Sequence, residues 1–229
     1  MERFLKAILE NDVSLVKELL KLDSGLSASC FETAVFYETS IFHWLYVGDS
    51  ALHLAAAGYR VEIVDILIAA GANPNFAGNH RGGTPLHYAA DGYVNGPAWN
   101  PKLQVETINR LIDAGAEIDL QDKNGATPLH RAVRTRCAAA VTCLLDHGSD
   151  TTIRNKSGST AFHLAVQNTG RGGSGSEEAV AGQRQIIIEF RRRGVSTGLR
   201  DGKGKTVLEC ARSRNVIELL IQDKDNSQL

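Results

Sequence analysis

The amino-acid sequence predicts an all-α solenoid, in which similar helix pairs stack side by side. The first observation is a motif that begins at Ser50, Thr84, Thr127, Thr160 and Thr206, with the sequences SALH, TPLH, TPLH, TAFH and TVLE. Successive motifs start 34, 43, 33 and 46 residues apart, which is a period near 33 with insertions of 1, 10, 0 and 13 residues. The second observation is a composition of 43% hydrophobic but only 6% aromatic residues, which suits such a stack. A repeat of this length indicates stacked supersecondary units.

The most regular repeat runs from Asp122 to Arg154, and its residues predict two short helices. Thr127 can cap the first helix through its hydroxyl group, and the proline after it suits the first helical turn. In the second helix, Val141, Leu144 and Leu145 form one apolar stripe. Neither helix can bury its apolar face alone, so we expect the units to stack.

This repeat resembles the ankyrin-repeat family, whose unit is a β-turn followed by two antiparallel helices. The pattern D-x-x-G-x-T-P-L-H-x-A followed by V-x-x-L-L-x-x-G-x-D is nearly complete from Asp122 to Asp150. It recurs from Gly82 to Asp119 and, less fully, from Asp49 to Asn75. The resemblance covers about four-fifths of the chain. It implies a scaffold or inhibitor that binds another macromolecule through its concave face and loops.

We expect one domain whose parts follow the repeat register. They are a capping helix pair at 1–23, an irregular segment at 24–49, repeats at 50–78, 79–121, 122–154 and 155–200, a capping repeat at 201–222 and a tail at 223–229. The first pair is rich in charge, as expected of a cap whose outer side faces water. Segment 24–49 departs from the pattern, and its β-branched and aromatic residues favour a short strand or an extended arm. Trp44 and Tyr46 are expected to pack against the stack.

Two insertions are expected to join an inner helix to its outer helix, at Asp91–Leu103 and from Asn168 to about Gly182. The first contains Tyr93 and Trp99, residue types that dominate binding hot spots. Trp99 either contacts a partner or folds back and pins its own loop. The second is rich in glycine and serine, which predicts a mobile loop, and deletion of Arg171–Gly182 is expected to cost little stability.

Sequence patterns for metal binding or catalysis are weak. The histidines that share one position in successive repeats are His53, His87, His130 and His163. They would lie about 8–10 Å apart, whereas zinc needs its nitrogen ligands about 2 Å from one ion. The family resemblance implies that each ties backbone turns together. Residues Gly198–Thr206 miss the phosphate-loop pattern, because Leu199 stands where glycine is required. We therefore predict no enzyme activity and no cofactor.

The charge balance and the chain's apolar segments limit the classes of partner. Twenty-five basic and 26 acidic residues give a net charge of −1, so the sequence does not predict a nucleic-acid partner. We see no apolar run of about 18 residues and no secretion signal, so we expect neither a membrane span nor export. The four scattered cysteines need no disulfide framework. We expect a cytoplasmic protein that is a monomer on its own.

The turn tips and the inner helices of such a stack form one concave face, which is the usual place for a partner. The residues that we predict to contact it are His80, Arg81, Tyr88, Asp91, Lys123, Asn124, Arg131, Arg134, Arg136, Lys156, Gln167 and Lys203, together with Tyr93 and Trp99 of the first insertion. This face is mostly basic, whereas acidic residues such as Asp65 and Asp146 fall on the outer helices. The charges either attract an acidic patch on a partner protein or only keep the stack in solution.

The sequence therefore predicts a non-catalytic protein–protein interaction module, which binds through its basic concave face and the Asp91–Leu103 loop. The alternative is a sensor of a small anionic ligand such as a nucleotide at the loop edge. In that case Tyr93 or Trp99 would stack on the ligand, and Arg131, Arg134 or Arg136 would meet its phosphates.

Overall fold

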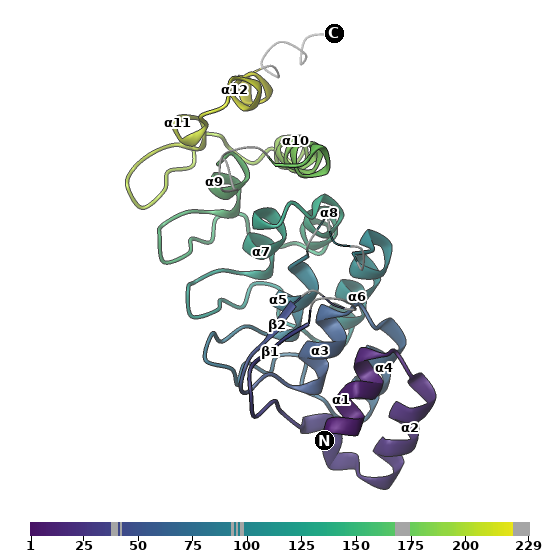
Figure 1. Ribbon diagram of the computed structural model, residues 1–229. Coiled ribbons are helices and arrows are strands. Elements are labelled where there is room, and N and C mark those ends of the chain that lie inside the picture. The colour runs from purple at the N-terminus through teal and green to yellow at the C-terminus, as the bar shows by residue number, and fades with distance from the viewer. Residues whose placement is uncertain are drawn as a thin grey trace.

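The protein is a stack of helix pairs, which confirms the predicted all-α solenoid (Figure 1). The computed structural model describes residues 1–37, 41, 43–92, 94, 96, 99–167 and 175–221. Within them, the inner helices are α1 (Glu2–Leu9), α3 (Ala51–Ala57), α5 (Pro85–Ala90), α7 (Pro128–Arg134), α9 (Ala161–Ala165) and α11 (Val207–Cys210). The outer helices are α2 (Val13–Leu22), α4 (Val61–Ala69), α6 (Pro101–Asp113), α8 (Ala138–Asp146), α10 (Glu177–Arg192) and α12 (Arg214–Ile221). None of the described helices is both long and apolar enough to cross a membrane.

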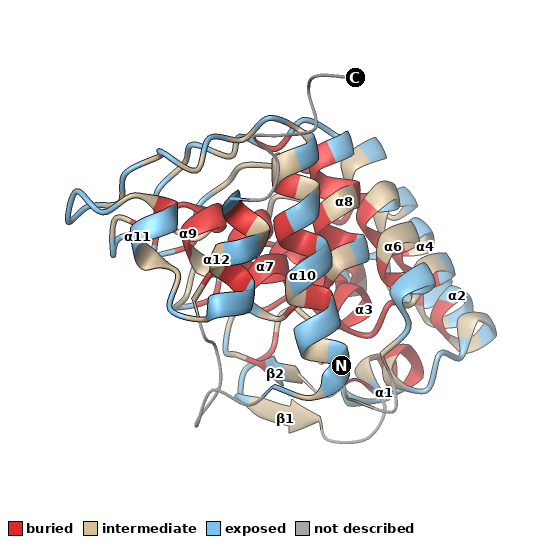
Figure 2. Ribbon diagram, turned by 90° about the horizontal axis from the view of Figure 1, so that it is seen from above, coloured by how far each residue is buried: buried red, intermediate tan, exposed pale blue. Residues whose placement is uncertain are grey.

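The core is one continuous layer between the two rows of helices. Each inner helix packs against the next inner helix, and each outer helix packs against the next outer helix. Buried residues gather between the two rows, and all residues of the inner helices α3 and α5 are buried, whereas the outer helices carry exposed residues on their outward faces (Figure 2). Each pair therefore depends on its neighbours for burial, as expected of a solenoid.

The recurring motif builds the same local structure in successive repeats. In α7, the backbone N–H of Thr127 donates to Nδ1 of His130 at 3.2 Å, and Nε2 of the same imidazole lies 3.1 Å from the carbonyl oxygen of Ser159 in the next turn. Since a carbonyl can only accept, Nε2 carries the proton. The equivalent contacts of Nε2 join His53 to Gly83 O at 3.0 Å, His87 to Ala126 O at 2.9 Å and His163 to Lys205 O at 3.2 Å. The expectation that these histidines tie turns together is confirmed.

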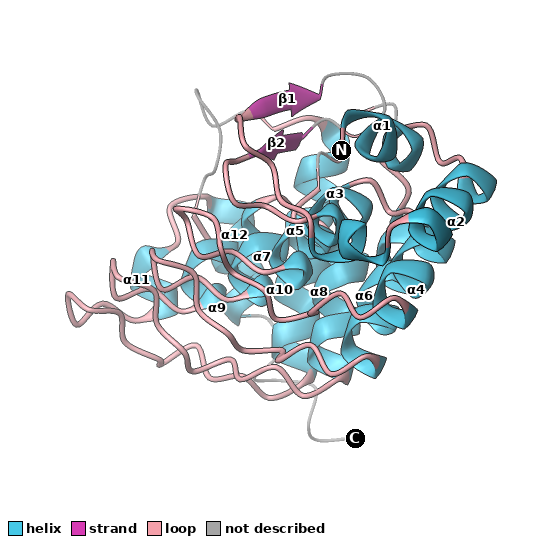
Figure 3. Ribbon diagram, turned by 90° about the horizontal axis from the view of Figure 1, so that it is seen from below, coloured by secondary structure: helices cyan, strands magenta, loops and turns pink. Residues whose placement is uncertain are grey.

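The turn tips form a ladder along one edge of the stack. The backbone N–H of Lys123 donates to Arg81 O at 2.8 Å, and that of Lys156 donates to Asn124 O at 2.9 Å. At Gly158, where φ is +78°, an added Cβ would lie 2.4 Å from Cα of the next turn, so a side chain would separate the two turns. The tips therefore stand in one row, as the unbroken edge of turns in Figure 3 shows.

Segment 24–49 folds into a 3₁₀ helix, Ser24–Ala28, and an antiparallel hairpin of β1 (Val35–Tyr37) and β2 (His43–Leu45). The hairpin lies over the inner row, with β2 against α3 (Figure 3). The expected short strand is confirmed. The expected packing of Trp44 against the stack is wrong, because Trp44 is 49% exposed. Side chains alternate along a strand, so the burial of neighbouring Leu45 leaves Trp44 on the open face.

The two insertions differ in how far they are helical. The first joins α5 to α6, as expected, and α6 begins at Pro101. In the second, residues 168–174 lie outside the described residues, and the structure corrects the rest, because Glu177–Gly182 form the start of α10. An added Cβ at Gly182 would lie 2.5 Å from Arg136 O, so this part of the helix packs closely on the preceding repeat. The low cost of deleting Arg171–Gly182 stays a prediction, and the deletion would remove the first turns of α10 and the contact of Gly182 with Arg136.

Candidate functional site

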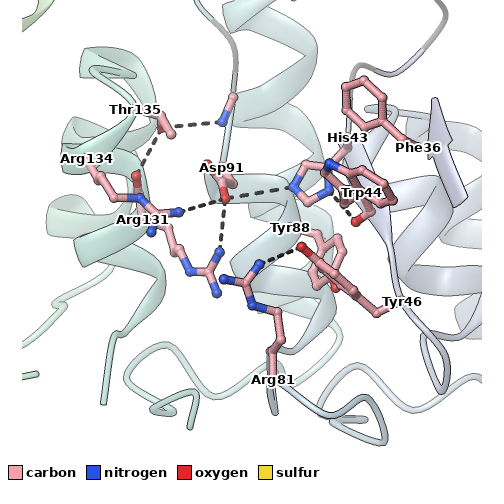
Figure 4. Close-up of a pocket in the computed structure, with 12 residues that line it drawn as sticks. Phe36, His43, Trp44, Tyr46, Arg81, Tyr88, Asp91, Arg131, Arg134 and Thr135 are labelled. Atoms are coloured by element: carbon pink, nitrogen blue, oxygen red, sulfur yellow. Dashed lines mark hydrogen bonds and ion pairs between the residues drawn. The ribbon is translucent and has the colours of Figure 1, made fainter. Parts of the chain in front are cut away.

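A pocket of about 290 Å³ opens between the hairpin and the inner helices α5 and α7 (Figure 4). We call it the hairpin pocket. Its hairpin wall consists of Phe36, His43, Trp44 and Tyr46, and its helical wall consists of Tyr88, Asp91, Arg131 and Arg134. Arg81, from the turn before α5, completes the mouth. The site therefore combines segment 24–49, which departs from the repeat pattern, with residues of two regular repeats.

Asp91 ends α5 and joins the two walls of the pocket. Its Oδ2 lies 3.1 Å from Nη1 of Arg131, 3.3 Å from Nη2 of Arg134 and 3.8 Å from Nε2 of His43. Burial alone would raise the pKa of Asp91, but contact with His43 and the charges of both arginines hold that pKa well below its usual range. The carboxylate is therefore ionised at neutral pH and already contacts three basic groups.

Three residues that were predicted to face a partner are buried instead. Tyr88, Arg131 and Arg136 are 4%, 7% and 7% exposed. Tyr88 donates its phenolic O–H to Asp49 Oδ2 at 2.7 Å, and Nη2 of Arg131 donates to Asp122 Oδ2 at 2.6 Å. The side chains of Tyr88 and Arg131 thus satisfy buried carboxylates inside the stack. Burial means that Tyr88, Arg131 and Arg136 are not the free contact residues that the sequence predicts.

Arg136 has a separate structural role at the end of α7. Its φ is +65°, and its guanidinium donates to the carbonyl oxygens of Ala165 at 3.0 Å and Gln167 at 2.7 Å. It thus satisfies the C-terminal carbonyls of the next inner helix. Gln167 itself is partly exposed and contributes its backbone carbonyl to this contact.

The remaining predicted cations of the pocket stay accessible. The side chain of Arg134 is half-exposed. Arg81 donates from Nη1 to the hydroxyl of Tyr46 at 2.6 Å, and its guanidinium lies 5.1 Å from the centre of the same ring. His80 is exposed and places its ring 4.9 Å from that of Tyr46. The aromatic hairpin and the turn at 80–81 therefore form one continuous surface.

Predicted residues of the later turns lie along the tip ladder, outside the pocket. Lys123, Asn124, Lys156 and Lys203 are all exposed. In the described part of the chain, no ion pair involves Lys123, Lys156, Lys203 or the adjacent Lys205. We call these four lysines the tip row.

The first insertion is held against its own repeat. The indole N–H of Trp99 donates to Oε1 of Gln104 at 3.0 Å, and Nε2 of Gln104 donates to Ala89 O at 3.0 Å. Trp99 also packs against the hydrophobic core. Of the two roles left open by the sequence, the structure shows the one in which Trp99 pins its loop. Tyr93 lies outside the described residues.

The four cysteines are free thiols without an activating environment. Burial raises the pKa of Cys137 to about 11 and that of Cys143 to about 11. Burial also raises the pKa values of Cys30 and Cys210. Since the thiolate is the nucleophile, none of these side chains is poised for covalent chemistry at neutral pH. The described residues contain no cluster of three or more His, Cys, Asp or Glu side chains that could hold a metal ion.

The hairpin wall of the pocket was not among the site residues predicted from the sequence. Phe36, His43 and Trp44 lie in a segment without repeat register, so periodicity could not place them. The signal was the aromatic content of this segment, which is high for a chain with only 6% aromatic residues. Its position over α5 follows from contacts such as that of the His43 and Tyr88 rings, whose centres are 4.7 Å apart.

Comparison with known proteins finds repeats of this kind over most of the chain. The family model for ankyrin repeats (3 copies) matches residues 4–96 and 98–181. Alpha-latrotoxin-Lhe1a of Latrodectus hesperus is 38% identical over 89 residues, which are 38% of this chain and 6% of the toxin. The inactive serine/threonine-protein kinase TEX14 of Bos taurus is 35% identical over 36% of this chain and 5% of its own length. The palmitoyltransferase AKR1 of Kluyveromyces lactis is 33% identical over 37% of this chain and 10% of its own length.

Each of these relatives is much longer than the region it shares with this chain, which spans 5% to 10% of their lengths. The similarity therefore concerns the repeats and not the rest of those proteins. Ankyrin repeats are generally protein–protein interaction modules and are typically not catalytic. With the matching family model, the tied turns and the stacked helix pairs together, the chain belongs to the ankyrin-repeat family.

Proposed function

We propose that this protein is a non-catalytic module that binds an acidic segment of another protein along its concave face. The contact surface runs from the hairpin pocket along the tip row. Trp99 is left out of this surface, because its indole is hydrogen-bonded to Gln104 within its own repeat.

The observation that carries the proposal is how the charged residues of the turns and those of the outer helices are paired. Acidic residues of the turns are used internally: Asp122 Oδ1 accepts the backbone N–H of Asn124 at 2.8 Å, and Asp201 Oδ1 accepts that of Lys203 at 2.8 Å. On the outer helices, some acids have cationic partners, as in Asp65 with Arg110 at 3.7 Å. The tip row presents four exposed lysines along one edge of the stack, and none of them forms an ion pair in the described residues.

A line of exposed positive charge attracts acidic partners and speeds their encounter. It also makes binding sensitive to salt, because exposed charges are screened within about 8–10 Å at physiological ionic strength. The geometry at the loop edge does not favour the sensor of a small anion that was predicted there. Arg131 and Arg136 are buried and bonded, and a pocket of about 290 Å³ is at the lower limit for a small-molecule site.

The proposal is tested by reversing charge on the tip row. We expect Lys123→Glu/Lys156→Glu to weaken binding of the captured partner at least tenfold, because two attractions become repulsions. The partner is first isolated by affinity capture from native extract with the wild-type protein, and the affinity is then measured at low and at physiological salt.

The matched control is Lys21→Glu/Lys102→Glu, which changes the net charge equally on exposed lysines of the outer helices α2 and α6. This control should retain the partner. If the tip-row variant and the control bind alike, the tip row is not the contact surface and the proposed function is wrong.

A further inference from the structure

The hairpin pocket combines two kinds of group that a peptide side chain can use. One wall is aromatic, with the rings of Phe36 and Trp44 stacked at 5.0 Å and those of Trp44 and Tyr46 stacked at 6.4 Å. The opposite side is cationic, with Arg134 on α7 and Arg81 at the mouth (Figure 4). We propose that this pocket recognises an acidic side chain next to an apolar side chain in an extended segment of the partner. This inference rests on the proposed function and specifies the chemistry of the partner.

The cationic side has donors left for a ligand. An arginine carries five N–H donors, and Arg134 uses one described hydrogen bond, to Asp91 at 3.3 Å. Arg81 uses its described side-chain bond on the hydroxyl of Tyr46. Asp91 Oδ2 is shared among His43, Arg131 and Arg134, so it does not occupy all the donors of the arginines. A carboxylate from the partner supplies the missing acceptors, and guanidinium groups bind carboxylates in a bidentate manner.

The aromatic side is exposed yet firmly held. Trp44 is half-exposed, and an exposed aromatic cluster beside polar residues is typical of an interaction site. The strand beneath it is fixed by Leu45, which is fully buried, and by the contact of His43 with Tyr88. The wall is therefore preorganised, so little conformational entropy is lost when an apolar side chain packs on it.

Size and position favour a peptide over other anions. Small-molecule sites usually measure about 300–1,000 Å³, so a pocket of 290 Å³ suits one or two side chains. The pocket also continues into the tip row, because the backbone carbonyl of Arg81 accepts the N–H of Lys123. An acidic segment that leaves the pocket along the turns would meet further positive charge.

The test is a selection of random linear 12-residue peptides displayed on phage, carried out on the full chain. We expect the selected peptides to share a Glu or Asp beside an aromatic or large aliphatic residue. Trp44→Ser and Arg134→Gln should each weaken binding of a selected peptide about tenfold or more in fluorescence polarisation. Replacing the shared Glu of the peptide by Gln should weaken its binding to the wild-type protein. The same replacement should hardly weaken its binding to Arg134→Gln, because the two changes remove the same contact.

Two matched variants control for the loss of an exposed apolar side chain and for the loss of a positive charge outside the pocket. Val47→Ser removes an equally exposed apolar side chain outside the pocket, and Arg110→Gln removes a half-exposed, ion-paired arginine on an outer helix. Both should bind the peptides as the wild type does, and thermal melts of all four variants exclude loss of folding as the cause of weaker binding.

The inference is overturned if no peptide is enriched on the wild type over the Trp44→Ser/Arg134→Gln double variant, or if the shared motif lacks an acid. Failure of this inference and failure of the proposed function are distinguishable. A partner lost by the tip-row variant but kept by both pocket variants would leave the proposed function standing and reject the pocket.

Discussion

Replacing Leu129 by alanine is expected to lower the free energy of unfolding by about 2–5 kcal/mol, the usual cost of a buried large-to-small change. Leu129 is 0% exposed and lies on α7, which packs against α5, α8 and α9 in the middle of the stack. The truncation leaves a cavity that neighbouring repeats cannot fill without moving. Since domains are stable by only about 5–15 kcal/mol, the loss is a large fraction of the total. Urea denaturation followed by circular dichroism measures it.

The control for this prediction is Ile188→Ala, on the outer face of α10, where the residue is 43% exposed. Its cost should stay below about 1 kcal/mol, as for most surface changes. Tryptophan fluorescence should report the same transition as circular dichroism, because a two-state comparison requires coincident probes. Equal costs for Leu129→Ala and Ile188→Ala would contradict the placement of Leu129 in the core.

Mild acid is expected to destabilise the protein as the pH falls from about 6.5 to about 4. Burial lowers the pKa of His87 from 6.5 to about 4, and burial also lowers the pKa values of His53 and His130. The unfolded chain therefore binds protons in a pH range where the folded chain does not. The contribution of His87 is present in full above pH 6.5 and is lost as the pH falls towards 4, which amounts to about 3 kcal/mol.

The measurement is the urea midpoint at pH 7.5, 6.5, 5.0 and 4.0. In His87→Asn, which is less stable at every pH, the decline between pH 6.5 and 4 should be smaller by about 3 kcal/mol. His80→Asn, at an exposed position, is the matched histidine control. A wild-type midpoint that stays constant from pH 7.5 to 5.0 would show that the buried histidines are not held in the neutral form.

The sequence by itself determined the repeated unit, because each part of that unit is specified within a few residues. The threonine at the start of α7, the proline after it and His130 cap the helix and bond the next turn. The apolar stripe of Val141, Leu144 and Leu145 predicts which side of α8 is buried. These are local interactions that recur with the period, so one repeat predicts the others.

Only the tertiary structure decided which predicted surface residues remain free and where the irregular segment lies. Asp91 and Arg131 are 40 residues apart in the sequence, and His43 is separated from both, yet their charges meet in one pocket. Periodicity places Arg131 and Arg134 on the same helix, but only the neighbouring carboxylates decide that the first is buried and the second accessible. The physical reason is that burial and charge pairing depend on groups brought together by packing, which no spacing within one repeat contains.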